Sequence, residues 1–245
     1  MYDNLKKKYG QNFLIDKNII NKIVSLIKNY NLSILEIGPG DGKLTNKIID
    51  KKPRELDLIE IDKVLIDNLH KQLKGNNFVS FINDDILKHD LKKTYDLVIS
   101  NLPYNISSQV LIKLTVMPFA PKEMILMFQK EFAIKLLDRN LNAINSIVNC
   151  FFSIKPKFHV SKNCFRPVPK IDSSVLKFEK LDQSLIKKKE IESFIEFKRY
   201  LFSHKRKSLR KLLKKYCLGE KFNLNIRAES LELKELIKIF REINV

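Results

Sequence analysis

Apolar runs and stretches with helical spacing alternate along the first two thirds of the chain. The runs have the length of buried strands and lie at Ser33–Ile37, Leu56–Ile61, Phe78–Ile82, Asp96–Ser100 and Lys122–Gln129. Helical spacing follows several of them, and an earlier helix is expected to begin after Asp16, a suitable N-cap. This alternation predicts an α/β fold with a mostly parallel, Rossmann-like sheet.

The pattern changes near residue 181. Two final strands are expected near Phe151–Ile154 and Ser174–Phe178. Beyond them the apolar spacing predicts helices only, at Glu190–Ser203, Arg206–Tyr216 and Ala228–Glu242. We therefore predict two domains, residues 1–181 on the sheet and residues 182–245 as a small helical domain.

The charge of the chain indicates an anionic partner. The formal net charge is +18, with 46 Lys and Arg against 28 Asp and Glu. Nucleic acid is the commonest partner of so basic a protein, although AT-rich coding also enriches lysine and accounts for part of the excess. The cations are concentrated, because residues 139–171 and 197–219 contain no acid.

The second acid-free stretch combines cations with apolar residues. Leu209, Leu212 and Leu213 form an apolar stripe, which predicts a packed helix with one basic face. Such a face is either solvated or in contact with an RNA backbone, and we favour RNA. The residues expected to bind RNA are Arg166, from the first stretch, and Lys205, Arg206, Lys207, Arg210, Lys211 and Lys214.

Composition disfavours several other classes of protein. Three cysteines without CxxC spacing and four scattered histidines predict reduced thiols and no metal site. The first residues show no apolar leader, and no run approaches membrane-spanning length. We therefore expect a soluble, cytoplasmic protein with no membrane partner. We also expect it to be a monomer.

The first buried run leads into a glycine-rich turn, Gly38-Pro39-Gly40-Asp41-Gly42. Strand, glycine turn and helix open many nucleotide sites, because glycine lets the backbone approach a ligand. The dinucleotide pattern GxGxxG would require glycine where Lys43 stands. Asp41 also disfavours a phosphate, so a cationic nucleoside such as S-adenosylmethionine fits better.

Polar residues also follow the next strands where each one ends. Glu60 lies 22 residues after Gly38, where a carboxylate can accept from both hydroxyls of a ribose. Asp85 can accept from an adenine amino group while Ile86 packs on the ring. Each acid alone is unremarkable, but this series together with Asn101 favours one nucleoside site.

The fourth strand ends in Asn101-Leu102-Pro103-Tyr104. Its proline prevents the strand from continuing, and the carboxyl edge is where open α/β sheets bind ligands. The Asn101 oxygen and a nearby backbone carbonyl can accept both N–H bonds of an adenine N6, while Tyr104 stacks on the ring. Accepting both protons favours a pyramidal nitrogen with an available lone pair. An ordinary polar turn is the alternative if the tetrapeptide is taken alone.

Seven motifs occur in an order that resembles one enzyme family. They are GQNFL (residues 10–14), EIGPGDG (36–42), IEID (59–62), DDIL (84–87), NLPYNIS (101–107), FRPVPKIDSSV (165–175) and the basic FSHKRKSL (202–209). Together they are similar to the ribosomal RNA adenine-N6,N6-dimethyltransferase family, particularly its bacterial small-subunit members. On spacing alone, a hydrophobic staple at the start of the first helix is the better explanation of GQNFL.

This resemblance implies transfer of methyl groups from S-adenosylmethionine to N6 of two adjacent adenines in the 3′-terminal hairpin of small-subunit rRNA. The partners would be this rRNA and the immature small subunit during ribosome biogenesis. The catalytic residues would be Asn101, Leu102, Pro103 and Tyr104. The cofactor-binding residues would be Asn12, Leu14, Gly38, Gly40, Glu60, Ile61, Asp85, Ile86 and Asn101.

The chain departs from the family pattern in two places, and three other functions stay open. Val168 replaces the middle one of three prolines, and Asn140–Ser146 lacks an expected Tyr-Gly pair. A large-subunit rRNA methyltransferase of the macrolide-resistance type is disfavoured by the basic C-terminal motif, and a DNA adenine methyltransferase by Leu102. The intact acids and amide at the strand ends argue against a non-catalytic RNA-binding assembly factor.

Overall fold

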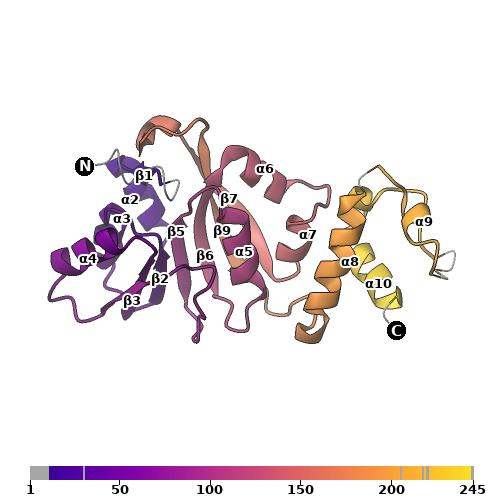
Figure 1. Ribbon diagram of the computed structural model, residues 1–245, viewed down its shortest axis with the longest axis horizontal. Coiled ribbons are helices and arrows are strands. Elements are labelled where there is room, and N and C mark those ends of the chain that lie inside the picture. The colour runs from indigo at the N-terminus through magenta and orange to yellow at the C-terminus, as the bar shows by residue number, and fades with distance from the viewer. Residues whose placement is uncertain (1–10, 30, 205, 217, 219–220, 244–245) are drawn as a thin grey trace. The chain divides into compact units, whose positions relative to one another are not determined.

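The computed structural model describes residues 11–29, 31–204, 206–216, 218 and 221–243 (Figure 1). The chain forms two compact units. Unit 1 comprises Met1–Ala133 and Ile154–Lys180, and unit 2 comprises Ile134–Ser153 and Leu181–Val245. The C-terminal part of unit 2 begins at Leu181, one residue before the predicted second domain, and unit 2 also includes residues 134–153, which the prediction assigned to the first domain. The separate roles assigned to the two domains stay a prediction.

A seven-stranded sheet with the order β4-β3-β2-β5-β6-β9-β7 forms the centre of unit 1. The strands from β4 to β6 are parallel to their neighbours, and β9 is antiparallel to β6. The α/β class is therefore confirmed, and the five predicted parallel strands are placed to within one residue. The bounds are β2 (Ser33–Ile37), β3 (Glu55–Glu60), β4 (Val79–Asn83), β5 (Leu97–Asn101), β6 (Glu123–Gln129), β7 (Phe152–Val160) and β9 (Ser173–Lys180).

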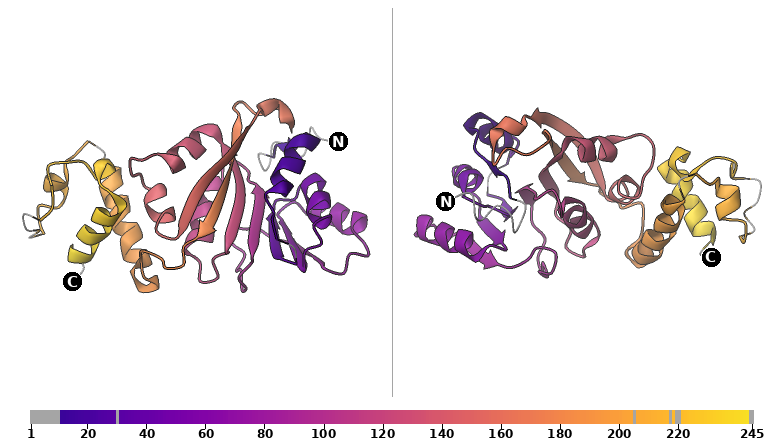
Figure 2. Two further views of the ribbon diagram at one scale, coloured as in Figure 1. Left: turned by 180° about the vertical axis from the view of Figure 1, so that it is seen from behind. Right: turned by 45° about the horizontal axis from the view of Figure 1, so that its top comes forward.

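Helices cover both faces of this sheet (Figures 1 and 2). They are α2 (Lys17–Ser25), α3 (Lys43–Ile49), α4 (Lys63–Gln72) and α5 (Ser107–Val116). Apolar residues of α2, α3 and α4 form one cluster with alternate strand residues, including Leu58 and Ile99. Side chains alternate across a sheet, so the intervening strand residues face the opposite side, where α5 lies. The predicted N-cap Asp16 accepts from the backbone N–H groups of Asn18 and Ile19, at 2.8 and 3.0 Å.

The strand order determines where a ligand can enter unit 1. β2 lies between β3 and β5, so the chain leaves β2 toward one side and later returns to its other side at β5. A crevice opens at the carboxyl ends of the strands where such a sheet reverses direction. The glycine turn after β2 and the tetrapeptide after β5 both lie at this point.

Unit 2 is helical and differs from the prediction in two segments. Its helices include α7 (Asn145–Val148), α8 (Ile191–Ser203), α9 (Leu209–Leu212) and α10 (Leu233–Ile243), while α6 (Lys130–Leu137) crosses the boundary between the units. The helix predicted over Arg206–Tyr216 is wrong, because only the four residues of α9 are helical. The backbone N–H groups of Leu209 and Arg210 donate instead to Ile226 and Leu224, at 2.9 and 2.7 Å. The last predicted helix also starts later, after a 3-10 turn at Ala228–Ser230.

Backbone hydrogen bonds explain why residues 134–153 group with the C-terminal part of the chain. The N–H of Leu181 donates to the carbonyl of Phe151 at 2.8 Å, and that of Leu141 donates to the carbonyl of Glu229 at 2.9 Å. Within the C-terminal helices, the rings of Phe194 and Phe240 meet edge to face at 5.1 Å. These long-range pairings are not visible in the local spacing of apolar residues.

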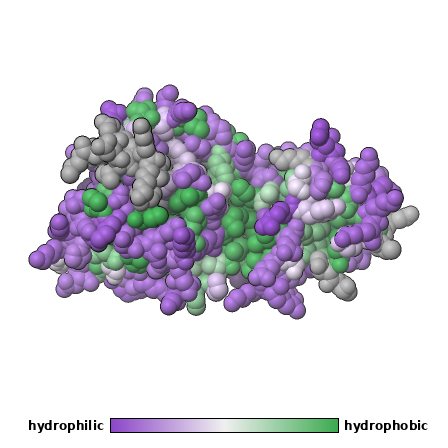
Figure 3. All heavy atoms as spheres, viewed as in Figure 1, coloured by the Kyte–Doolittle hydropathy of each residue, from purple (hydrophilic) through white to green (hydrophobic). Residues whose placement is uncertain are grey.

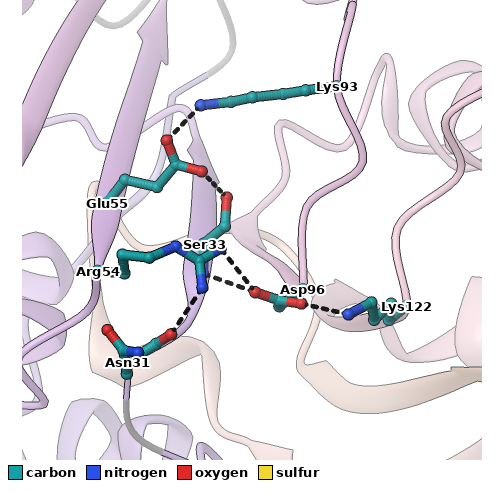
Figure 4. Close-up of polar contacts among 7 residues, drawn as sticks. All are labelled: Asn31, Ser33, Arg54, Glu55, Lys93, Asp96 and Lys122. Atoms are coloured by element: carbon teal, nitrogen blue, oxygen red, sulfur yellow. Dashed lines mark hydrogen bonds and ion pairs between the residues drawn. The ribbon is translucent and has the colours of Figure 1, made fainter.

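A polar network links the amino ends of the central strands, at the edge opposite the crevice. Figure 4 shows its members Asn31, Ser33, Arg54, Glu55, Lys93, Asp96 and Lys122. The ammonium of Lys93 lies 2.7 Å from Glu55 and 2.9 Å from the carboxylate of Asp57, whose side chain is 9% exposed. The hydrogen bonds from Lys93 and Ser33 lower the pKa of Glu55 below its ordinary value of 4.5.

The side chain of Lys93 is expected to stabilise unit 1 in a pH-dependent way. Lys93→Met leaves the buried Asp57 with a single partner and should lower the free energy of unfolding by about 1–3 kcal/mol near neutral pH. Glu55 has a lowered pKa in the folded state, so its contribution is present above pH 4.5 and is lost as the pH falls through the lowered value. The deficit of the variant should therefore shrink in acid, as urea unfolding at about pH 7 and about pH 3 would show.

Lys122→Met is a matched control for this prediction. In the wild-type protein the ammonium of Lys122 pairs with Asp96 at 2.7 Å, but the Lys122 side chain is 68% exposed. We expect a loss below about 1 kcal/mol. A Lys93→Met deficit that is equally small, or equal at both pH values, would contradict the proposed role of Lys93.

Candidate active site

One pocket of unit 1 opens at the carboxyl ends of the parallel strands. Its walls come from the segment before α2, the glycine turn after β2, the ends of β3 and β5, and the loop after β4. Every residue predicted for the cofactor or for catalysis lines this one pocket: Asn12, Leu14, Gly38, Gly40, Glu60, Ile61, Asp85, Ile86, Asn101, Leu102, Pro103 and Tyr104. Their individual roles stay predictions.

The glycine turn leaves space on its pocket side. Gly38 has a φ of +65°, and a Cβ added there would meet no atom within 4 Å. A Cβ on Gly40 would lie 3.0 Å from the ring of Phe13, so that ring packs directly on the turn. A ligand can therefore approach the backbone closely at Gly38, where no other atom occupies the space, while the ring of Phe13 packs against Gly40.

The carboxylate of Glu60 is held at the end of β3 by backbone donors. Its oxygens accept from the N–H of Gly40 at 3.3 Å and from the N–H of Asp62 at 3.1 Å. Glu60 is only 4% exposed, and this burial raises its pKa although the backbone donors oppose the change. The side chain therefore joins the glycine turn to β3 and presents a fixed acceptor to the pocket.

Glu36, the penultimate residue of β2, lines the pocket and was not among the predicted site residues. It is 1% exposed, and its Oε2 has no hydrogen-bond partner among the described residues. Burial raises its pKa to about 8, and the nearby charges of Glu60 and Asp41 add to the rise, although the hydroxyl of Thr45 opposes it. A buried carboxyl group with an unpaired oxygen is a suitable partner for a cationic ligand. The sequence feature that could have indicated Glu36 as a site residue is its position two residues before Gly38 in the EIGPG motif.

The amide of Asn101 has a defined orientation. Its Nδ2 donates to the backbone carbonyl of Asn12 at 2.9 Å. A carbonyl can only accept, so the amide nitrogen must face Asn12, and Oδ1 is left as an acceptor. No described residue donates to Oδ1. An acceptor atom of Asn101 is therefore available in the pocket, and its role toward a base stays a prediction.

The ring of Tyr104 is anchored next to this amide. Its hydroxyl lies 2.7 Å from Oγ of Ser173, a fully buried residue at the start of β9. Burial raises the pKa of Tyr104, so the hydroxyl stays protonated near neutral pH. The contact with Ser173 fixes the ring that we expect to stack on a base.

The loop after β4 is fixed from two sides. Oδ1 of Asp85 accepts from the N–H of Leu87 at 2.9 Å, and the ammonium of Lys113 on α5 donates to the carbonyl of Leu87 at 3.1 Å. Apolar walls flank this loop, because Ile86 is 5% exposed and Ile61, at the end of β3, is 42% exposed. An acceptor between two apolar side chains is suited to a purine ring with an amino group.

Residues 11–14 of the GQNFL motif form part of the pocket wall, and Gly10 lies outside the described residues. Phe13 and Leu14 make the short strand β1 (Phe13–Leu14), which pairs antiparallel with β8 (Phe165–Arg166). In this register Phe13 lies opposite Arg166, so this exposed cation stands next to a wall residue of the pocket. Leu14 is buried in the main apolar cluster.

The other residues predicted to bind RNA lie in unit 2. Arg206 and Lys207 precede α9, Arg210 and Lys211 lie in it, and Lys214 follows it. All five are exposed, and none forms an ion pair with a described residue. Lys205 lies outside the described residues.

The described residues contain no group of three or more His, Cys, Asp or Glu side chains that could hold a metal ion. Cys150 and Cys164 are free thiols, and Cys217 lies outside the described residues. In the described part of the chain, each helix is too short or too polar to cross a membrane.

Comparison with known proteins identifies the family. The family model described as ribosomal RNA adenine dimethylase matches residues 2–243. The chain belongs to this family. It is therefore an rRNA adenine dimethyltransferase of the S-adenosylmethionine-dependent type, and the predicted activity class and cofactor are confirmed.

Individual relatives agree with this assignment. The chain is 36% identical over 255 residues to ribosomal RNA small subunit methyltransferase A of Mycoplasmopsis pulmonis, covering 97% of this chain and 98% of that one. A dimethyladenosine transferase from Plasmodium falciparum superposes with a TM-score of 0.83 at 25% identity, covering 95% and 97% of the two chains. The 23S rRNA methyltransferase ErmE shares the fold, with a TM-score of 0.75 at 22% identity and coverage of 96% and 100%.

The burial of Glu36 predicts a specific dependence of stability on pH. Its pKa in the folded state, about 8, lies above the ordinary value of 4.5, so its contribution to stability is full below pH 4.5 and is lost as the pH rises through 8. Glu36→Gln cannot titrate and should make the free energy of unfolding decline less across this range. Urea unfolding without ligand, at about pH 5 and about pH 8, measures the difference. Equal declines in the two proteins would show that the Glu36 carboxyl group is already ionised when folded.

Proposed function

We propose that this protein dimethylates N6 of two adjacent adenines in the 3′-terminal hairpin of small-subunit rRNA. We further propose that it acts as a cytoplasmic monomer on the immature small subunit. The observation that carries the proposal is the orientation of Asn101, whose Nδ2 is bonded to the Asn12 carbonyl and whose Oδ1 is available to the amino group of a base. The relatives named small subunit methyltransferase A support the choice of subunit.

The residues of the pocket fit S-adenosylmethionine. The unpaired Oε2 of Glu36 is suited to the ammonium group of its methionine part, and the open side of Gly38 gives the backbone room to approach. Glu60 would accept from the ribose hydroxyls, and Asp85 and Ile86 would hold the adenine. When bound, the cofactor supplies a methyl group made electrophilic by its positively charged sulfur.

The chain's own groups would then orient the target base. Tyr104, anchored by Ser173, stacks on the adenine ring, while Asn101 Oδ1 and a backbone carbonyl of the tetrapeptide accept the two N6 protons. This hydrogen bonding keeps the nitrogen lone pair out of the ring and strengthens as positive charge develops on N6. No histidine base is required, because N6 becomes acidic only after it has been methylated and water or a carbonyl can then take the proton. The N–H that remains on N6 after the first methylation allows a second methyl transfer to the same nitrogen.

The most direct test of the proposed function is methylation of separated ribosomal particles. Labelled S-adenosylmethionine would be incubated with immature small subunits and, in parallel, with large subunits that lack adenine methylation. We expect label only in the small subunit, at two adjacent adenines that mass spectrometry identifies as dimethyladenosine. Label confined to the large subunit would instead support the alternative function, a large-subunit rRNA methyltransferase such as ErmE.

The role of Glu60 predicts a loss of cofactor affinity. Glu60→Ala removes the acceptor for two ribose hydroxyls and should weaken binding of S-adenosylmethionine by about 1–3 kcal/mol, measured by calorimetry. Glu60→Gln is the matched control, because it keeps one acceptor for the Gly40 N–H and should lose less. Unchanged affinity in a folded Glu60→Ala protein would remove Glu60 from the site.

The role of Asn101 predicts a loss in the chemical step. Asn101→Ala should lower the single-turnover rate of methyl transfer by about 100-fold or more, the scale of removing one preorganised polar group. RNA affinity should change little, because the interaction strengthens only as charge develops. Both proteins must be compared at saturating S-adenosylmethionine, since Asn101 also borders the cofactor. A variant that keeps its rate and loses only RNA affinity would make the amide a docking group.

A further inference from the structure

Unit 2 exposes an aromatic ring in the most basic part of the chain. Tyr200, near the end of α8, is 45% exposed. It lies within the acid-free stretch 197–219, a few residues before Arg206 and Lys207. The nearest acid on the same face of α8 is Glu196, one turn toward the amino end and away from the cations. Figure 3 shows a largely hydrophilic surface around α8 and α9 on its visible face.

Contacts at its edges hold the ring in place. The Tyr200 hydroxyl donates to the carbonyl of Leu212, the last residue of α9, at 3.1 Å. The ring of His204 lies 5.2 Å away at an interplanar angle of 58°. His204 is itself held, because its Nδ1 lies 3.0 Å from the carbonyl of Tyr200 and 3.0 Å from Oγ of Ser203. The tyrosine is thus ordered while much of its surface stays open to solvent.

A purely structural role explains only part of this arrangement. The hydroxyl ties α8 to α9, but that hydrogen bond does not require the ring to be exposed. Arg206, Lys207 and Lys211 are exposed and lack ion pairs with described residues, so they can attract phosphates without reading bases. An ordered ring among phosphate-binding cations is the combination that single-stranded RNA sites use, because unpaired bases stack on aromatic side chains.

We propose that Tyr200 is a stacking platform for one unpaired base of RNA, with adjacent phosphates bound by Arg206, Lys207 and Lys211. This inference rests on the proposed function, since the RNA would be the small-subunit rRNA. Tyr200 would belong to a second recognition site, in a different unit from the methylation pocket. It would contribute to affinity and not to the chemical step.

The dependence of binding on salt separates stacking from charge. Affinity for small subunits that lack the two dimethyladenosines would be measured over a range of salt concentrations. Tyr200→Leu should weaken binding about fivefold or more, as expected for one stacked base, and should leave the slope of log affinity against log salt unchanged. Tyr200→Phe keeps the ring and should retain most of the affinity. Lys207→Gln should instead flatten the slope by roughly 0.7–0.9.

The absence of tryptophan from the sequence provides a direct optical test. Tyr200→Trp places a single indole at the platform, and Phe119→Trp places one at a position of similar exposure, 43%, in unit 1. Phe119 lies outside the acid-free stretches and does not line the pocket. A stacked base should quench the indole at position 200 when the same subunits are added, and the indole at position 119 should respond much less.

These outcomes distinguish the platform from the proposed function. Methylation of the same subunits by the wild-type protein shows that the function holds, and its failure would refute that function independently of Tyr200. With methylation intact, wild-type affinity in Tyr200→Leu together with an unquenched Tyr200→Trp would overturn the platform. A Tyr200→Leu effect that appears as a changed salt slope would also overturn it, because the loss would then lie in phosphate contacts.

Discussion

The hydrogen bond from Asn101 Nδ2 to the carbonyl of Asn12 is the contact on which the site depends. It joins the end of β5 to a segment 89 residues earlier in the chain and determines which atom of the amide is left for a substrate. The same segment continues into β1, whose Phe13 supports the glycine turn and pairs with β8 beside Arg166. One bond therefore links the amide that we propose as the acceptor for the base to the segment that supports the glycine turn and pairs with β8.

Two buried acids line the pocket and make it better suited to a cation than to an anion. Glu60 is satisfied by backbone donors, whereas Glu36 keeps an unpaired oxygen and a pKa raised to about 8 by burial. Holding such groups out of water costs stability in the protein without a ligand. A positively charged nucleoside would offset that cost by favouring the ionised form of these acids, whereas a phosphate would increase it. The electrostatics of the wall thus agree with the family's cofactor.

The sheet and most of the pocket were predictable because their signals are local. Buried parallel strands are continuous apolar runs, and polar residues just after each run must meet at the carboxyl edge of the sheet, as Glu60, Asp85 and Asn101 do. Glu36 was missed because it sits inside such a run, where an acid appears to be part of the strand. The helix expected over Arg206–Tyr216 failed for a different reason: the N–H groups of Leu209 and Arg210 bond to residues 224–226, and no local pattern reports that pairing. The inclusion of residues 134–153 in unit 2 has the same long-range origin.

We propose that Asn101 presents its oxygen, and not its nitrogen, to the amino group of the target adenine. A crystal structure with S-adenosylhomocysteine and an RNA fragment carrying the target adenines would test it most directly. We expect Asn101 Oδ1 at hydrogen-bond distance from N6, about 2.7–3.2 Å, with Nδ2 still bonded to the carbonyl of Asn12 and Tyr104 stacked on the base. An adenine held elsewhere, or a rotated amide whose Nδ2 faces the base, would contradict it.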